Sequence, residues 1–215
     1  TVFAAPTSHL ATLLGNVELG CSIIGDPASF LQGLGLAAEW LTEGKADVCR
    51  VIGAEESHWL TADALWQFQH NATSTSGAGA VCLCRDPGVS IGVELSAITD
   101  AHTFSAKTSR VQAALAMRAQ LPPGAPGELL CDGAGNSCHR IDAAEQKAWQ
   151  DWPGARLSPK RVLGEGLMAA AAWQCVVGCD AVARQAASAA MISVVGCSQQ
   201  AIGAQHVEER GQGQG

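Results

Sequence analysis

Tyrosine is absent from this sequence, and only 5% of its residues are aromatic and 15% charged. Its 13 lysines and arginines face 20 acidic residues, which gives a formal net charge of −7 without a basic stripe and argues against nucleic-acid binding. No run approaches the roughly 20 apolar residues that a membrane-spanning helix needs, and the N-terminus lacks the basic and apolar regions of a signal peptide. These absences predict a cytoplasmic protein without a membrane span.

The chain has 215 residues, of which 47% are hydrophobic, enough for one sizeable core or two packed lobes. Its nine cysteines include no pair of matched CxxC motifs, and the odd count argues against a disulfide framework. We interpret them mainly as small buried hydrophobes. The alternative is a metal held by Cys82 and Cys84 on one strand face, or by Cys175 and Cys179 on one helix face. No cofactor and no metal is predicted, because no His or second Cys pair stands beside them.

Apolar periodicity predicts strands that alternate with helices, which is typical of a layered α/β architecture. The helix over 166–182 carries little charge on any face and is expected to be buried. We expect a turn over 196–203 and a frayed tail over 208–215. The other expected helices are 7–14, 27–42, 105–120 and 140–152, and the expected strands are 21–24, 48–54, 78–85, 89–100, 128–132 and 187–195.

Five segments together resemble the β-ketoacyl synthase (thiolase-like) family, in the family's order and at compatible intervals over nearly the whole chain. The resemblance implies an α/β fold of the thiolase-like, layered α-β-α-β-α type. It covers the part of that fold from just before the nucleophile turn to the C-terminus. The segments are Leu36–Val48 followed by Val51–Glu56, Gly77–Val81, Asp132–Asn136, Ser158–Glu165 and Gly196–Gly203.

The chain departs from the family at the catalytic positions. The position of the family's nucleophilic cysteine is occupied by Pro27. Its neighbours Asp26 and Ala28 are no better replacements, and Cys21 lies on the wrong side of the turn to serve as the nucleophile. The two catalytic histidines are replaced by Asp132 and Glu165. Decarboxylative condensation in this family needs a thiolate for the acyl chain and imidazole donors for the developing negative charge, which carboxylates oppose. The resemblance is therefore to a degenerate member without the Cys-His-His residues.

Two interpretations of the replacing residues stay open. Asp26, Asp132 and Glu165 could converge on one cavity and bind a cation or act as acid and base. The interpretation that we favour is structural: Asp132 and Glu165 satisfy backbone N–H groups or pair with Lys160 or Arg161. Ser29 likewise could accept an acyl group at a helix start, but a serine there is ordinarily a cap or packing residue.

Ketosynthase subunits resembling this chain have a first half upstream of Thr1, and we predict that this half is a second chain or has been lost. Thr1 is then a processing boundary or, less simply, an N-terminal nucleophile. The missing half would leave a strand edge and apolar helix faces uncovered. Residues 1–85 would close the first thiolase-like half, residues 86–207 would form the second, and residues 208–215 a flexible tail.

The resemblance implies a non-catalytic subunit like the chain-length factors of type II polyketide and fatty-acid systems. Such a subunit forms a homo- or heterodimer with a ketosynthase and offers a surface to acyl carrier protein. The alternatives are an acyl-transferring or hydrolysing relative that uses Ser29 or the carboxylates, and a self-associating scaffold. Whether the chain is an enzyme stays open at this point.

Overall fold

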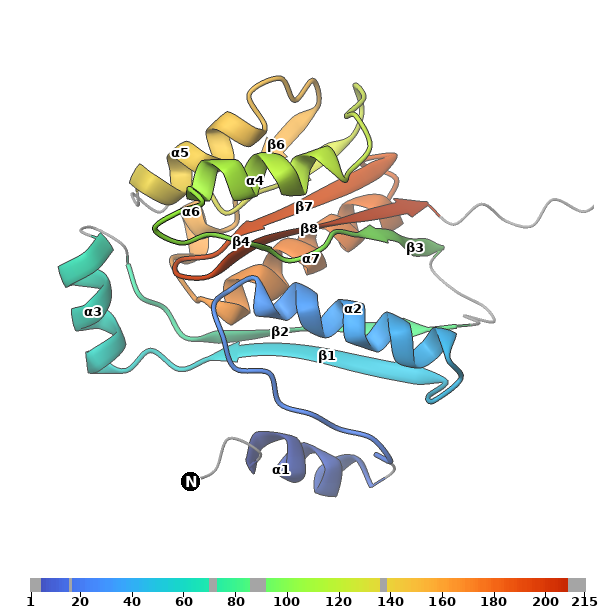
Figure 1. Cartoon of the computed structure of the whole chain (residues 1–215). Coiled ribbons are helices and arrows are strands. Elements are labelled where there is room, and N and C mark those ends of the chain that lie inside the picture. Colours follow the sequence, from blue (N-terminus) through green and yellow to red (C-terminus); the bar gives the residue numbers. More distant parts are fainter. Residues whose placement is uncertain (1–4, 16, 70–72, 86–91, 136–138, 209–215) are drawn as a thin grey trace, which may run out of the picture.

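The protein is described here by a computed structural model that covers residues 5–15, 17–69, 73–85, 92–135 and 139–208. Its elements alternate along the chain as the sequence predicts, and Figure 1 shows them stacked in layers. In chain order they are α1 (Ala5–Leu14), α2 (Ser29–Thr42), β1 (Val48–Glu55), α3 (Trp59–Gln69), β2 (Gly77–Cys84), β3 (Val93–Ile98), β4 (His102–Thr103), α4 (Arg110–Ala119), β5 (Leu129–Cys131), α5 (His139–Ala148), β6 (Ala155–Leu157), α6 (Lys160–Leu163), α7 (Met168–Ala183), β7 (Ala189–Val195) and β8 (Gln200–Glu208).

A six-stranded mixed sheet forms the centre of the described chain. Its strand order is β3-β8-β7-β5-β6, with the short β4 also paired to β8. Strand β5 runs parallel to β6 and β7, whereas β8 runs antiparallel to β7 and β3. In Figure 1, α4 and α5 lie above this sheet, and α2 and α7 lie below it.

Strands β1 and β2 form a separate antiparallel pair on the far side of α2 and α7 (Figure 1). We call this pair the β1–β2 ribbon. Its inner face packs on α7 and α2. Gly53 and Gly79 lie opposite each other in the ribbon, and they let α7 approach closely. A Cβ at Gly53 would lie 2.6 Å from the Met168 carbonyl oxygen, and a Cβ at Gly79 would lie 2.8 Å from the Ala172 Cβ.

Two apolar clusters fill the spaces between the layers. The larger lies between the sheet and the α2–α7 layer and includes Leu31, Leu34, Cys175 and Ile192. The second lies under α4 and α5 and includes Met117, Leu130, Trp149 and Met191. The apolar helix predicted over 166–182 is α7, which is largely buried, because it packs against both the sheet and the β1–β2 ribbon.

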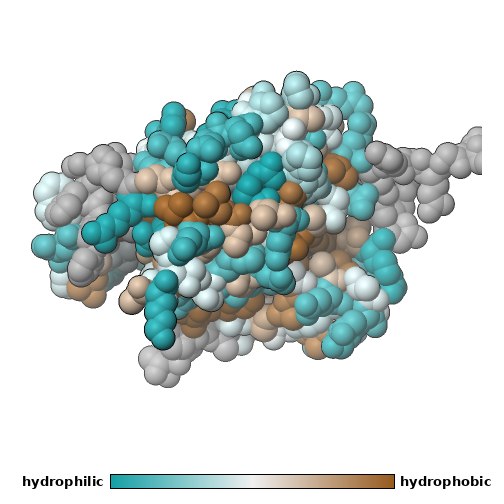
Figure 2. All heavy atoms as spheres, turned by 45° about the horizontal axis from the view of Figure 1, so that its top comes forward, coloured by the Kyte–Doolittle hydropathy of each residue, from teal (hydrophilic) through white to brown (hydrophobic). Residues whose placement is uncertain are grey.

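The surface carries hydrophobic side chains in several places. On the face seen in Figure 2, hydrophilic side chains predominate and hydrophobic ones gather in patches between them. The large hydrophobic residues that the β1–β2 ribbon exposes are Val48 and Ile52, which lie on its outer face. Among the described residues, no helix combines the length and the apolar character that a membrane span requires.

Several sequence predictions about the elements are wrong. Residues 21–24 form no strand, and the predicted turn over 196–203 is short because β8 already begins at Gln200. The predicted helices over 105–120 and 140–152 are α4 and α5, which begin at Arg110 and end at Ala148 respectively. Helices α3 and α6 and strands β4 and β6 were not predicted from the sequence. Thr1, Asn136 and most of the 208–215 tail lie outside the described residues.

The interpretation of the cysteines as buried hydrophobes needs correction. Cys49, Cys131 and Cys175 are buried, but Cys82 and Cys84 point away from α7 on the outer face of β2 and are exposed. The reason is the two-residue period of a strand, which places the glycines of β2 inward and these thiols outward. Cys21 is exposed as well, Cys179 and Cys197 are partly exposed, and Cys138 lies outside the described residues.

Candidate functional site

Asp26 joins the turn before α2 to the loop between β7 and β8. Its carboxylate is 4% exposed and accepts hydrogen bonds from the backbone N–H groups of Gln199 (2.9 Å), Gln200 (3.2 Å) and Ala28 (3.1 Å). A Cβ at Gly196 would overlap this carboxylate, so the loop needs glycine there. Asp26 therefore acts as an anchor between two segments that are far apart in the sequence.

Pro27 and Ser29 are buried at the beginning of α2. The Pro27 carbonyl accepts a hydrogen bond from the Phe30 N–H (3.2 Å), as in a first helical turn. The Ser29 hydroxyl packs tightly on Gly25, because a Cβ at Gly25 would overlap its oxygen. This close packing indicates a structural role for Ser29, for which the sequence had left a catalytic role open.

Asp132 follows β5 and is held by three kinds of donor. Its side chain is 1% exposed and pairs with Arg156, whose Nη2 and Nε lie 2.6 and 3.1 Å from Oδ2. The Ser158 hydroxyl and the Ala134 N–H donate to Oδ1. The favoured structural interpretation predicted backbone N–H partners correctly, but the paired cation is Arg156 and not Lys160 or Arg161. Arg156 lies on β6, whose parallel pairing with β5 brings it alongside.

Glu165 pairs with Lys160, which is one of the partners that the same interpretation left open. The Lys160 Nζ lies 2.8 Å from Glu165 Oε2, and the two side chains are only 3% and 4% exposed. The other carboxylate oxygen accepts the Leu167 N–H at 2.8 Å. Burial acts to lower the pKa of Lys160, but Glu165, and after it Glu145 and Cys197, act to raise it, and the net shift is upward. The buried amine and carboxylate thus compensate each other inside the fold.

Sequence reasoning missed Glu145, which lies on α5 and is completely buried. It accepts the Ser193 hydroxyl (2.7 Å) and the Val195 N–H (3.2 Å), and Trp149 Nε1 donates to the same Ser193 oxygen (2.9 Å). Burial, and next the charge of Asp132, raise the pKa of Glu145 to about 8. The helical spacing could have predicted its burial, because Glu145 follows Ile141 by four residues and so lies on the apolar face of α5.

Lys160 brings these groups together. A Cβ at the buried Gly133 would lie 3.6 Å from both Lys160 Nζ and Glu145 Oε1, so the amine and the carboxyl group flank this glycine. The Cys197 thiol lies near the same point: burial, Asp26 and Glu165 raise its pKa, while the Ser198 hydroxyl and Lys160 act to lower it. Electrostatic interactions therefore connect Glu165 to both Lys160 and Cys197, Glu145 to Lys160, and Asp26 to Cys197.

The cluster has limited chemical capacity as it stands. Asp26, Asp132 and Glu165 each accept at least two hydrogen bonds from donors within the chain. Over the described ranges, no three His, Cys, Asp or Glu side chains come together in a way that could hold a metal ion. The groove that the structure shows lies elsewhere, between α2 and β3, and none of these carboxylates lines it. The arrangement thus resembles a structural joint more than an acid–base site.

No protein-family model and no curated protein matches this sequence. Solved structures do match it. A type II polyketide ketosynthase bound to a hexaketide, in complex with its acyl-carrier protein (AntDE:AntF), has a TM-score of 0.75 at 15% identity, covering 96% of this chain and 63% of that one. The ishigamide ketosynthase/chain length factor has a TM-score of 0.76 at 11% identity, covering 95% and 64%. A β-ketoacyl synthase from Burkholderia phymatum has a TM-score of 0.68 at 16% identity, covering 86% and 60%.

These matches establish the fold of the chain. The chain has the ketosynthase-like, thiolase-type fold, in agreement with the resemblance of its five segments. It spans less than two thirds of the length of each of the three matched chains. At identities of 16% or less, the likeness establishes the fold, and activity and partners have to be argued from the site.

Proposed function

We propose that this chain is a non-catalytic ketosynthase-like subunit of a fatty-acid or polyketide type II system. The observation that carries the proposal is the use of Asp132 and Glu165, the positions that the resemblance equates with the family's histidines, in buried ion pairs with Arg156 and Lys160. A carboxylate that accepts hydrogen bonds from a cation is not placed to donate one to a developing oxyanion. Pro27, which the resemblance equates with the nucleophile position, offers no nucleophile either.

The proposed partner is an active ketosynthase, or a separate chain or upstream segment that supplies the first half of the fold. Support comes from the β1–β2 ribbon, which is too small to be stable alone and shows Val48, Ile52, Cys82 and Cys84 on its uncovered face. Two of the matched structures are a ketosynthase/chain length factor and a ketosynthase with its acyl-carrier protein. By analogy we propose a dimer of this kind, with acyl carrier protein as a further partner. The free thiols of the described cysteines fit the reducing cytoplasm.

Pairing is tested by co-expression of the chain with candidate first-half or ketosynthase subunits, followed by co-purification. We expect a stable complex, and we expect Ile52→Glu to abolish it because the new charge would be buried in the interface. Glu18→Gln, at an exposed site before α2, is the matched control and leaves the complex intact. Pairing that survives Ile52→Glu would place the interface away from the ribbon.

Catalysis is tested with acylated carrier protein and malonyl carrier protein as substrates. The chain alone is expected to give no turnover, and the chain with its ketosynthase is expected to change the length of the product. Asp132→Asn, Glu165→Gln, Ser29→Ala and Cys197→Ala are expected to leave that change in place when the variants are folded.

The competing function is acyl transfer or hydrolysis with a replaced catalytic set. Cys197 is the observation that favours it, since this partly exposed thiol lies beside Lys160 and Glu165. The raised pKa of Cys197 opposes it, because the thiolate is the nucleophilic form. Turnover by the chain alone that disappears in Cys197→Ala or Ser29→Ala would establish the enzyme and end the non-catalytic proposal.

A further inference from the structure

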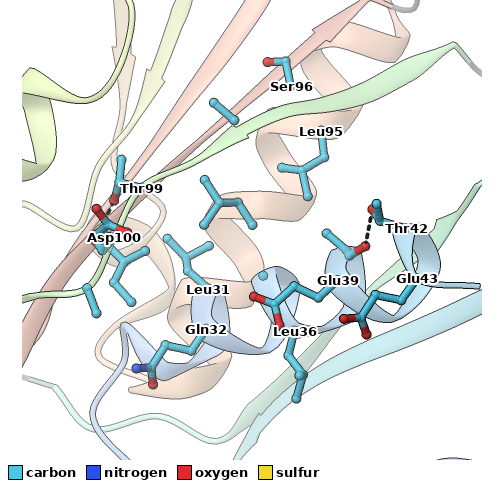
Figure 3. A pocket seen from close by; sticks show the side chains of 16 residues that line it. Leu31, Gln32, Leu36, Glu39, Thr42, Glu43, Leu95, Ser96, Thr99 and Asp100 are labelled. Carbon is cyan, nitrogen blue, oxygen red and sulfur yellow. Dashed lines mark hydrogen bonds between the residues drawn. The ribbon is translucent and has the colours of Figure 1, made fainter. Parts of the chain in front are cut away.

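A groove of about 620 Å³ runs between α2 and β3, on the side of α2 that faces the six-stranded sheet (Figure 3). We call it the α2–β3 groove. Figure 3 shows Leu31 and Leu95 pointing into it from opposite sides. Ile98 and Ile202 also line it and complete an apolar floor. An apolar floor that is open to solvent favours an occupant with its own apolar side chains.

The rim of the groove carries charge of one sign. Glu39, Glu43 and Asp100 line it, whereas no lysine or arginine is among its sixteen lining residues. Lys45 pairs with Glu43 at 2.6 Å, and Asp100 accepts the Gln120 amide at 2.8 Å, so part of the acidic charge is already occupied. The chain as a whole carries a net charge of −7. An acidic partner is therefore repelled here, and a basic one is attracted.

Gly35 keeps the groove open from the α2 side. It lies in the middle of a helix, where glycine is less favourable than any residue except proline. Its backbone does not require glycine, and a Cβ there would touch only the Ile98 Cγ2, at 3.9 Å. By contrast, a Cβ at Gly33 on the same helix would come within 3.1 Å of Val51. Gly35 thus gives up helix stability without a packing reason, and the gain is room in the groove.

The free edge of β3 is poorly suited to pairing with another strand. Within the described chain β3 pairs only with β8, and its register shifts between Leu95 and Ala97. The residue between them, Ser96, donates its hydroxyl to the Gln205 backbone and side chain. Such a bulge bends the strand and interrupts its row of hydrogen-bonding groups. Affinity at this groove must therefore come from side chains, as it does when an amphipathic helix lies in a groove.

From this geometry we propose that the α2–β3 groove docks a basic amphipathic helix of a partner protein, with its apolar stripe on the Leu31–Leu95 floor and its cations at Glu39, Glu43 and Asp100. Between Leu31 and Glu43, α2 extends over about 18 Å, which matches a partner helix of about 12 residues. The inference rests on the proposed role as a partner subunit, and it names the chemistry of a second contact besides the β1–β2 ribbon.

The test uses the full chain and two synthetic 14-residue peptides with the same leucine stripe, one with lysine and one with glutamate on the polar face. Fluorescence anisotropy is expected to show saturable binding of the lysine peptide, weakened by salt, and at least tenfold weaker binding of the glutamate peptide. Gly35→Leu fills the groove and is expected to weaken lysine-peptide binding at least tenfold, with an unchanged or higher Tm. The double variant Glu39→Gln/Asp100→Asn is expected to weaken binding of the lysine peptide severalfold.

Ala62→Leu and Asp63→Asn, at exposed positions of α3, are the matched controls and keep wild-type binding. Ile52→Glu is also expected to keep wild-type peptide binding, although this variant is expected to lose the partner contact at the β1–β2 ribbon. Failure of the groove proposal is therefore distinguishable from failure of the proposed subunit function. Equal binding of both peptides, or lysine-peptide binding that Gly35→Leu leaves intact, overturns the proposal. A wild-type chain that is dimeric and becomes monomeric in Gly35→Leu assigns the groove to a second copy and overturns it as well.

Discussion

At the scale of single residues, the buried charges of the cluster are stabilised in pairs. Arg156 compensates Asp132, and Lys160 compensates Glu165. Among the described residues no cation forms a hydrogen bond with Glu145, and burial raises its pKa to about 8, which favours the neutral form below that pH. Asp132 and Glu165 thus rely on paired cations, whereas the charge of Glu145 depends on the pH.

Removal of one member of the Lys160–Glu165 pair should be costly. Lys160→Met leaves the Glu165 carboxylate buried without compensation, and we expect the free energy of unfolding to fall by about 3–5 kcal/mol. Urea denaturation measures this loss, and the double variant Lys160→Met/Glu165→Gln should recover much of it. Lys45→Met, which removes a half-exposed pair with Glu43, is the control and should cost less than about 1 kcal/mol. Equal effects of the two single variants would contradict the burial of the pair.

Glu145 should make stability depend on pH in a defined direction. Its pKa is about 8 in the folded chain and near 4.5 in the unfolded chain, so the folded state holds the proton more tightly. This contribution is complete below pH 4.5 and is lost as the pH rises toward 8, by at most about 1.4 kcal/mol per pH unit. Glu145→Gln is neutral throughout and should flatten the fall between pH 6 and 8 in urea titrations. Glu18→Gln should keep the wild-type slope; a Glu145→Gln profile as steep as wild type would show that another group titrates.

At the scale of elements, the contact between α7 and the β1–β2 ribbon depends on two facing glycines. A side chain at Gly79 would collide with Ala172 of α7. We therefore expect Gly79→Val to destabilise the chain by about 1–3 kcal/mol through overpacking, although valine favours strands. Ala80→Val, one residue further on the exposed face, is the control and should be close to neutral in thermal unfolding. A neutral Gly79→Val would mean that the ribbon can move away from α7 without cost.

The elements also show why some sequence predictions held and others did not. Helix α2 matched closely because its apolar spacing and the stop near Gly44 are local signals. The turn predicted over 196–203 overlaps the beginning of β8, because Gln200 and Gly203, like Gln205 further along, are unusual in a buried strand. In the structure, Gln200 accepts the Gln32 amide and Gln205 the Ser96 hydroxyl, partners that are more than 100 residues away along the chain. Such compensation is invisible to a local pattern.

At the scale of the whole molecule, the exposed face of the ribbon should be detectable by its thiols. Iodoacetamide at pH 8 followed by mass spectrometry should label Cys82 and Cys84 in the native chain. Cys131, whose pKa burial raises to about 12, and the buried Cys175 should react only after unfolding. Addition of the partner that covers the ribbon should protect Cys82 and Cys84. Persistent labelling in a purified complex would show that this partner binds elsewhere.

The resemblance of five ordered segments predicted the thiolase-like α/β class, and apolar periodicity predicted the buried helix α7. The sequence also offered Lys160 as one of several partners for Glu165, because the two lie only five residues apart. It could not determine the Arg156 partner of Asp132, the buried Glu145 or the α2–β3 groove. Each of these arises where strands or helices distant in the sequence are brought together, by the β5–β6 pairing, by the contact of α5 with β7 and by the packing of α2 beneath β3. The division into residues 1–85, 86–207 and 208–215 stays a prediction. Tertiary structure decided the roles of Asp26, Asp132 and Glu165, because the burial and partners of a carboxylate depend on the three-dimensional neighbours that compensate its charge.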